Sequence, residues 1–252
     1  VIAAVNGAAF AGGLGLVGAS DIVIAVEDAP FSFSEVRIGV IPALIAVVAL
    51  TFRVTGIALL LAAVVGVPIG AALGLARFPG RRLVTLLLYT GMGLPPVVVG
   101  LFVYVVFSRS GPLGDLGWLF TPAAMIAAQT IIAFPLVAAL TMSAVDGVDR
   151  DLRLQVRALG ATRWQLAWTV LREARIGVTA ALVAAFGGII SEVGAVMLVG
   201  GNVEGQTRVL TTAIMLYARQ GDFALAMALG LILIALAMAA NAVLLQLQGR
   251  SR

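Results

Sequence analysis

The residue types available for chemistry are few, because all sixteen basic residues of this 252-residue chain are arginines and the sequence contains no lysine, histidine or cysteine. A Ser–His or Cys–His nucleophile pair, a thiolate or imidazole metal site and a P-loop lysine are therefore excluded. Ten of the twenty-eight charged residues are concentrated in residues 146–175, between two long apolar runs. Such a charged block faces water or a soluble partner. Because the residue types named above are missing, we predict no catalytic residue, no metal site and no cofactor on this chain.

The composition is that of a membrane protein. Hydrophobic residues make up 62% of the chain, charged residues 11%, and the mean hydropathy is +1.12, whereas a soluble domain has about 25% charged residues. Five long stretches approach or exceed the roughly 20 residues with which a helix crosses a bilayer, and they lack the alternation of barrel strands. We predict an all-α membrane protein with about five transmembrane helices: 54–76, 83–108, 116–145, 176–191 continuing past Glu192, and 223–249.

The distribution of arginines predicts the orientation. The loops after the first and third spans, together with the C-terminus, hold eleven arginines, against three in the opposite loops. Because basic loops stay in the cytoplasm, the charged block is expected to be cytoplasmic. Arg37 and Arg53 precede the predicted first span and would lie outside, against this trend. The net charge of +4 is then explained by topology and not by nucleic-acid binding.

Two breaks in the apolar pattern predict a translocation pathway or gate. Pro95 and Pro96 lie inside the second span, where a missing backbone donor bends a helix. Glu192 is the one charge within an apolar run, and an ionisable group at membrane depth usually faces a bundle interior or a watery cavity. The alternatives stay open: proline is common in membrane helices, and Glu192 could lie near a membrane surface or bond a neighbouring helix.

Two other segments have simpler interpretations. Gly66, Gly70 and Gly74 recur every fourth residue, which predicts close packing between helices. Residues 208–219 form an apolar stretch too short to cross the membrane. We expect this segment to lie on the outer surface or to dip partway into the bundle.

Within the charged block, residues 154–171 predict two short helices broken at Gly160, because glycine lets the backbone turn without a Cβ clash. Leu154, Leu159, Trp164 and Trp168 provide apolar side chains among solvated arginines. Such a surface suits docking on a soluble protein. An amphipathic loop resting on lipid headgroups is the alternative, and spacing alone favours it.

This loop resembles the cytoplasmic coupling loop of the permease subunits of ABC importers, whose pattern is Glu-Ala-Ala, three further residues, then Gly. Gly160 matches the glycine, whereas a different triplet precedes it and Arg172 stands where the family often has proline. The resemblance implies an ATPase-docking loop made of Leu154, Gln155, Val156, Arg157, Ala158, Leu159, Gly160, Ala161 and Arg163.

From about residue 48 to the C-terminus the chain is similar to the tungstate and molybdate branch of these permeases, through motifs at 77–82, 93–101, 108–114, 191–202 and 207–214. The likeness implies a type I importer architecture: a homodimer in the cytoplasmic (inner) membrane of a bacterium or archaeon that moves an oxyanion by alternating access. A separate ATP-binding ABC subunit would hydrolyse ATP, and an extracytoplasmic substrate-binding protein would deliver tungstate or molybdate. A passive channel is an alternative.

Residues 1–44 do not look like the start of a permease. Two apolar runs separated by a glycine-rich turn predict a β-α-β piece that resembles the crotonase family of enoyl-CoA hydratases and isomerases. Gly12 matches the family's oxyanion-hole glycine and Glu35 one of its two glutamates, but Gly15 replaces the other. The family resemblance also implies an upstream strand that is missing here. One donor and one carboxylate do not hold and protonate an enolate.

We therefore expect residues 1–44 to be a vestigial fragment that does not fold independently, joined to a permease domain over 45–252. A crotonase-type acyl-CoA hydratase or isomerase is the rival function from another class. As a further alternative, residues 1–26, with a single charge, could form a weak extra span.

Overall fold

The computed structural model describes residues 2–5, 9–10, 22–27, 31–32 and 40–249, in two compact units, Val1–Ala49 and Leu50–Arg252. In the first unit, β1 (Ile2–Val5) pairs in parallel with β3 (Ile22–Ala25), and β2 (Ala9–Phe10) with β4 (Phe31–Ser32). Parallel pairing needs a crossover, as the predicted β-α-β piece requires. The predicted helix between the strands lies outside the described residues.

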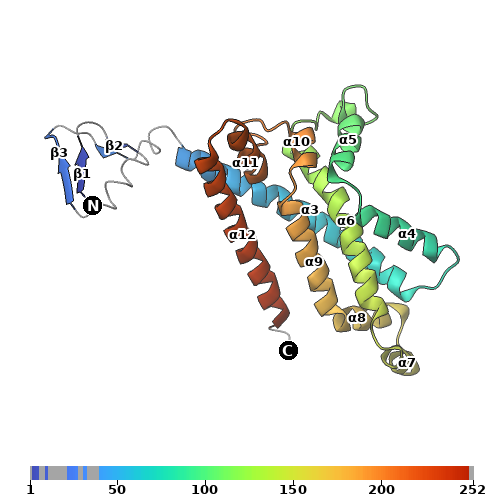
Figure 1. Ribbon diagram of the computed structural model, residues 1–252. Coiled ribbons are helices and arrows are strands. Elements are labelled where there is room, and N and C mark those ends of the chain that lie inside the picture. Colours follow the sequence, from blue (N-terminus) through green and yellow to red (C-terminus); the bar gives the residue numbers. More distant parts are fainter. Residues whose placement is uncertain (1, 6–8, 11–21, 28–30, 33–39, 250–252) are drawn as a thin grey trace. The chain divides into compact units, whose positions relative to one another are not determined.

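Residues 40–249 are mainly helical, which confirms the predicted all-α class (Figure 1). Three helices are long and apolar enough to cross a membrane: α3 (Val40–Leu75), α6 (Pro122–Asp146) and α12 (Phe223–Gly249). Two bent pairs bring the number of candidate spans among the described residues to as many as five, if each pair counts as one span. One pair is α4 (Arg81–Met92) with α5 (Pro96–Phe107), and the other is α8 (Arg163–Glu173) with α9 (Arg175–Ile190).

Several predicted spans were wrong in detail. The second is no single helix: α4 and α5 meet at 99°, because the chain leaves the helix at Gly93 and restarts after Pro95. The fourth does not continue past Glu192, since α9 ends at Ile190 and the short α10 (Gly194–Gly200) begins anew. Arg53 lies within α3 and not before the first span. The third span begins at Pro122, after a 3-10 turn, η1 (Gly114–Leu116).

Helix α6 forms the centre of the second unit and packs against α4, α5, α9 and α10. It also approaches α3 closely, as the four-residue glycine spacing predicted. A Cβ on Gly70 would lie 2.4 Å from the Ala138 carbonyl oxygen, and one on Gly74 would lie 2.7 Å from Val145 Cγ1. The glycines therefore serve packing between α3 and α6.

Polar caps fix where the long helices begin. The Thr121 side chain accepts a 3.2 Å hydrogen bond from the Ala123 backbone N–H at the start of α6, and Asp222 accepts a 3.1 Å bond from the Leu225 N–H in α12. Such a bond satisfies one of the backbone donors that the first turn of a helix leaves unpaired.

The arginine-rich segments share one end of the helical unit. Figure 1 shows α8 and α7 (Arg150–Ala158) at the end where α12 finishes, with α10 and α11 (Leu210–Arg219) at the opposite end. This arrangement is the one that the predicted alternation of loops requires. The first turn of α11 is buried, and its Leu210 N–H donates a 2.9 Å bond to Thr51 Oγ1. Of the two alternatives for this segment, the structure favours the one that dips into the bundle.

Candidate functional site

The charged block folds into two capped helices separated by a left-handed glycine, which confirms the predicted break. Asp149 accepts a 2.9 Å bond from Asp151 N–H at the start of α7, and a reciprocal capping box between Thr162 and Gln165 starts α8. Gly160 lies between the helices at φ +81°, and a Cβ there would meet no described atom within 4 Å. Glycine is therefore required by the backbone conformation and not by lack of space.

Large apolar side chains on this loop point into solvent. Leu159 is 87% exposed, Trp164 84%, Trp168 71% and Leu154 60%. Of the nine residues predicted to form the docking loop, all are exposed except the partly buried Val156 and Ala161. An exposed apolar group of this size marks an interaction surface.

The opposite face of α8 anchors the loop to the bundle. Leu166 and Val170 are buried and form a cluster with Val145, Val148 and Ala174. Because residues three or four apart share one face of a helix, α8 holds the bundle with one side and presents Trp164 and Trp168 with the other. The loop thus forms a platform that is anchored on one face and exposed on the other.

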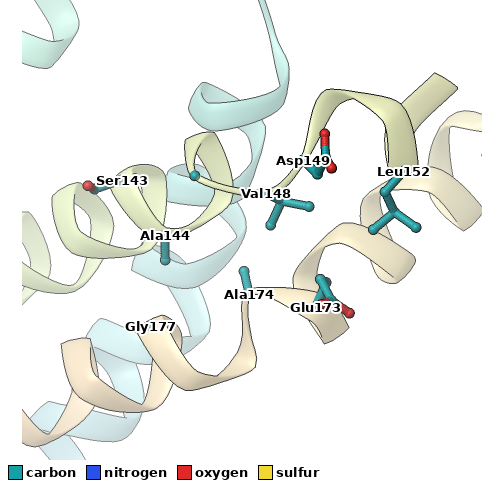
Figure 2. A pocket seen from close by; sticks show the side chains of 9 residues that line it. Ser143, Ala144, Val148, Asp149, Leu152, Glu173, Ala174 and Gly177 are labelled. Atoms are coloured by element: carbon teal, nitrogen blue, oxygen red, sulfur yellow. The ribbon is translucent and has the colours of Figure 1, made fainter.

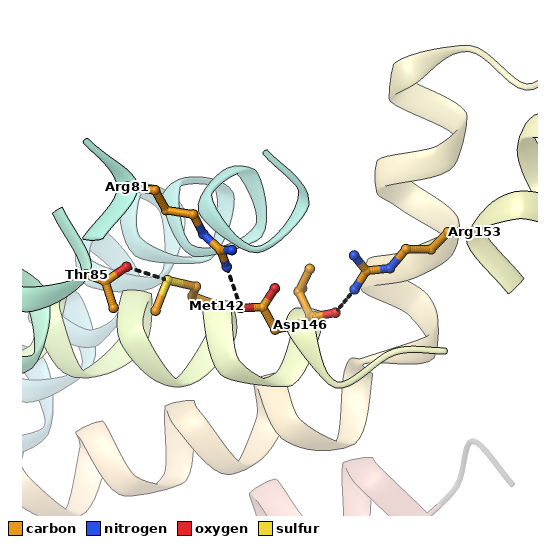
Figure 3. A network of polar contacts seen from close by, with 6 residues as sticks. Arg81, Thr85, Met142, Asp146 and Arg153 are labelled. Atoms are coloured by element: carbon orange, nitrogen blue, oxygen red, sulfur yellow. Dashed lines mark hydrogen bonds and ion pairs between the residues drawn. The ribbon is translucent and has the colours of Figure 1, made fainter. Parts of the chain in front are cut away.

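Polar contacts also tie the loop to the end of α6 (Figure 3). Arg153 of α7 donates to the backbone carbonyl of Val145, and Arg81 of α4 forms a hydrogen-bonded ion pair with Asp146. An open groove of about 590 Å³ lies at the same place, between the end of α6 and the start of α9 (Figure 2). It is lined by Ser143, Ala144, Gly147, Val148, Asp149, Leu152, Glu173, Ala174 and Gly177.

The structure brings the two predicted gate elements together. Helix α5 starts at Pro96 and α10 at Gly194. A Cβ on Gly194 would lie 2.5 Å from Val97 Cγ2, so the first turns of the two helices touch. The break between α4 and α5 and the break between α9 and α10 are therefore neighbours. Pro95, exposed before α5, and the partly buried Pro96 make the first break.

Glu192 lies in the second break, partly buried, and stabilises the start of α10. Its Oε1 accepts a 2.9 Å hydrogen bond from Ala195 N–H, and its backbone carbonyl accepts a 3.0 Å bond from Thr211 Oγ1 of α11. The carboxylate thus has a structural contact, and it remains beside the junction with α5.

Sequence reasoning missed two features of this region. Gln129 of α6 is 4% exposed and donates a 2.9 Å bond from Nε2 to the Ile189 carbonyl, at the end of α9, while its Oε1 has no hydrogen-bond partner among the described residues. The signal in the sequence was that Gln129 is a single amide side chain within an uncharged span. The ion pair between Arg81 and Asp146 was also missed, because the sequence analysis used the arginines only to predict how the chain is oriented in the membrane. The predicted vestigial positions Gly12 and Glu35 lie outside the described residues.

Comparison with known proteins agrees with the fold. Residues 66–251 match the family model described as "Binding-protein-dependent transport system inner membrane component", and residues 1–76 match the enoyl-CoA hydratase/isomerase model. The helical unit resembles the solved structure of a bacterial ABC transporter that imports alginate, with a TM-score of 0.70 and 19% identity over 88% of this chain and 85% of that one. That likeness shows the shared fold.

Two curated relatives are similar in sequence over most of their length. A probable anion ABC transporter permease protein of Haloferax volcanii is 46% identical over 79% of this chain and 88% of the relative. A tungstate uptake system permease protein of Peptoclostridium acidaminophilum is 39% identical over 85% of this chain and 94% of the relative. With a family match over most of its residues, this chain belongs to the inner membrane components of binding-protein-dependent transport systems, the permease subunits of ABC importers.

Proposed function

We propose that the chain moves an oxyanion, tungstate or molybdate, into a bacterial or archaeal cell by alternating access. It works as a homodimer with two ATP-binding ABC subunits on the cytoplasmic side and an extracytoplasmic substrate-binding protein on the other. ATP is bound and hydrolysed by the partner subunit. The substrate class is supported by the two relatives, one named for anions and one for tungstate.

The observation that carries this proposal is the exposed apolar surface around Gly160. Burying one large apolar side chain stabilises an interface by about 1.5–3 kcal/mol, and Leu159, Trp164 and Trp168 are all more than two-thirds exposed. A platform anchored on one face and apolar on the other suits docking on a soluble ATPase. Closure of the two ATPase subunits would then move the loop as a rigid body.

The paired breaks support a pathway that opens and closes. The break between α4 and α5 contacts the break between α9 and α10. Helices that meet at such breaks can change their packing, as alternating access requires. Helices α3, α4, α5, α9, α10 and α12 contain no carboxylate, and α6 has one only at its last residue, so an anion would meet little like charge beyond Glu192. Leu94 and Val97 beside the first break are about half exposed in a single copy, where the second subunit would cover them.

For the N-terminal residues we propose a crotonase-like fragment over 1–44 that does not fold independently, followed by the permease domain over 45–252. The match of residues 1–76 to the hydratase/isomerase model and the parallel pairing of β1 with β3 support the likeness. In β3 every residue is exposed, so this strand buries little apolar surface, and a two-stranded sheet is at best marginally stable alone.

The test is the ATPase rate of the purified complex, containing this chain, its ATP-binding subunit and the substrate-binding protein, in lipid nanodiscs. Binding protein loaded with tungstate or molybdate should raise the rate of ATP hydrolysis above the rate with empty binding protein. Chloride at the same concentration serves as the control anion. An ATPase rate indifferent to both oxyanions would contradict the assigned substrate class, and a permease that binds no ATPase would favour a passive channel.

A further inference from the structure

We propose that Arg81 and Arg153 are positioning residues for transport, which join the α7–α8 loop, the end of α6 and the start of α4 into one moving unit. Through this link, motion of the loop reaches the break between α4 and α5. The inference rests on the proposed function and deepens it, because it names the route by which ATPase closure reaches the candidate gate.

The first half of the link joins α7 to α6. The Arg153 side chain, on the second turn of α7, donates to the Val145 carbonyl in the last turn of α6. Carbonyl groups at a helix end lack intrahelical partners and attract a cation. Val145 itself is 0% exposed and packs with Leu166 and Val170 of α8. The end of α6 is therefore held by both helices of the loop.

The second half joins α6 to α4. Asp146, the residue after Val145, pairs with Arg81, the first residue of α4 (Figure 3). One turn further along, Thr85 Oγ1 donates to Met142 Sδ at 3.7 Å, and Leu88 packs with Met142 in a buried cluster. Because successive residues of α6 bind the two arginines, a displacement of α7 carries the start of α4 with it.

The far end of α4 makes this connection useful. Helix α4 spans 12 residues and ends at Met92, where the chain breaks before α5. Helix α5 is held at the other end of α6, since Val103 shares a buried cluster with Ala124 there. It also touches α10, where a Cβ on Gly100 would lie 2.6 Å from the Ala195 Cα. When α4 moves and α5 is held, the change concentrates at Gly93, Leu94 and Pro95. That segment is the first of the two adjacent breaks.

A simpler role for Arg81 is contact with lipid headgroups, as for any basic residue at a membrane surface. A role in the link requires Asp146 as the partner of Arg81, whereas contact with lipid headgroups does not. The pair is partly exposed, with side-chain exposures of 29% for Arg81 and 45% for Asp146, so it contributes little to folding. Arg82, next in sequence, is exposed and has no ion pair in the described part of the chain. It provides a control with the same loss of charge.

The experiment measures tungstate taken up and ATP hydrolysed by the complete complex in proteoliposomes. Arg81→Gln and Asp146→Asn should each raise the ATP used per tungstate about five- to tenfold, at the low end of measured coupling between sites. Arg82→Gln should leave the ratio unchanged. The exchanged pair Arg81→Asp with Asp146→Arg should restore it. An equal effect of Arg82→Gln, or no recovery in the exchanged pair, would overturn the link.

A cross-linking arm tests whether the two helices stay together. Since the chain has no cysteine, Arg81→Cys with Asp146→Cys introduces the only two thiols. Before cross-linking this variant should behave like Arg81→Gln, and a short bifunctional thiol reagent should restore the ratio. Arrested uptake after cross-linking would mean that the helices must separate, against the proposal. The wild-type complex is measured in parallel, because failure of its own ATP-driven uptake contradicts the proposed function, whereas failure in the variants alone contradicts only the link.

Discussion

Gly100 of α5 and Ala195 of α10 touch backbone to backbone: a Cβ on Gly100 would lie 2.6 Å from the Cα of Ala195. This contact joins α5 to α10, next to the break between α4 and α5 and the break between α9 and α10. Pro96 and Glu192 are 96 positions apart in the sequence. The contact explains why they lie in one region of the structure.

We expect Gly100→Ala to destabilise the permease, because the new methyl group would force α5 away from α10. Overpacking of this kind costs about 1–3 kcal/mol. Thermal unfolding in detergent measures the effect as a lower midpoint. Gly187→Ala is the matched control, since a Cβ there would meet no described atom within 4 Å. Equal midpoints for the two variants would show that the close contact is not needed.

Replacing Gly160 tests whether the glycine is needed for its left-handed backbone conformation or for the absence of a side chain. Gly160→Val should weaken ATPase binding about tenfold, because a branched residue at φ +81° is strained by roughly 1–2 kcal/mol. Gly160→Asn should retain most of the binding, since asparagine tolerates the left-handed region. Binding of the detergent-solubilised permease to immobilised ATPase measures both. If Val and Asn behave alike, the turn at Gly160 does not set the docking geometry.

Both faces of α8 can be tested with one pair of variants. Trp168→Ala should lower affinity for the ATPase about thirtyfold, the loss typical of a 2 kcal/mol interface residue, and should leave thermal stability unchanged because Trp168 is 71% exposed. Leu166→Ala should instead lower the unfolding midpoint, since Leu166 is 7% exposed. Undiminished ATPase binding by Trp168→Ala would place the docking surface elsewhere.

Glu192 has two separable properties, its hydrogen bond and its charge. Glu192→Gln keeps an oxygen that can accept from Ala195 N–H, so the unfolding midpoint should stay the same while tungstate uptake changes with the loss of charge in the pathway. Glu192→Ala also removes the cap and should cost about 0.5–2 kcal/mol of stability. If Glu192→Gln shows wild-type uptake and stability, the charge has no role in transport and the residue serves only as a helix cap.

Local signals in the sequence predicted local structure well. Gly160 between two amphipathic runs acts within a few residues, and the structure confirms the predicted break there. The caps at Thr121 and Asp222 depend on equally local contacts. Composition sufficed for the all-α class, because the hydrophobic length of a span depends on no distant residue.

The features that the sequence did not predict depend on distant contacts. Pro95 and Pro96 predicted a bend in the second span, but no local signal showed that α4 and α5 would be separate helices at 99° to each other. Arg81 and Asp146 are 65 positions apart, and Gln129 and Ile189 are 60 apart. Only the packing of α4 and α9 against α6 brings these pairs together, and no local pattern encodes it.

The most direct measurement of the central claim is accumulation of tungstate inside proteoliposomes that contain the complete complex, with binding protein outside and ATP inside. We predict that tungstate concentrates against its gradient, that a non-hydrolysable ATP analogue stops the accumulation, and that Gly160→Val reduces it. Equilibration of tungstate without ATP, at a rate unaffected by the analogue, would contradict an ATP-driven permease.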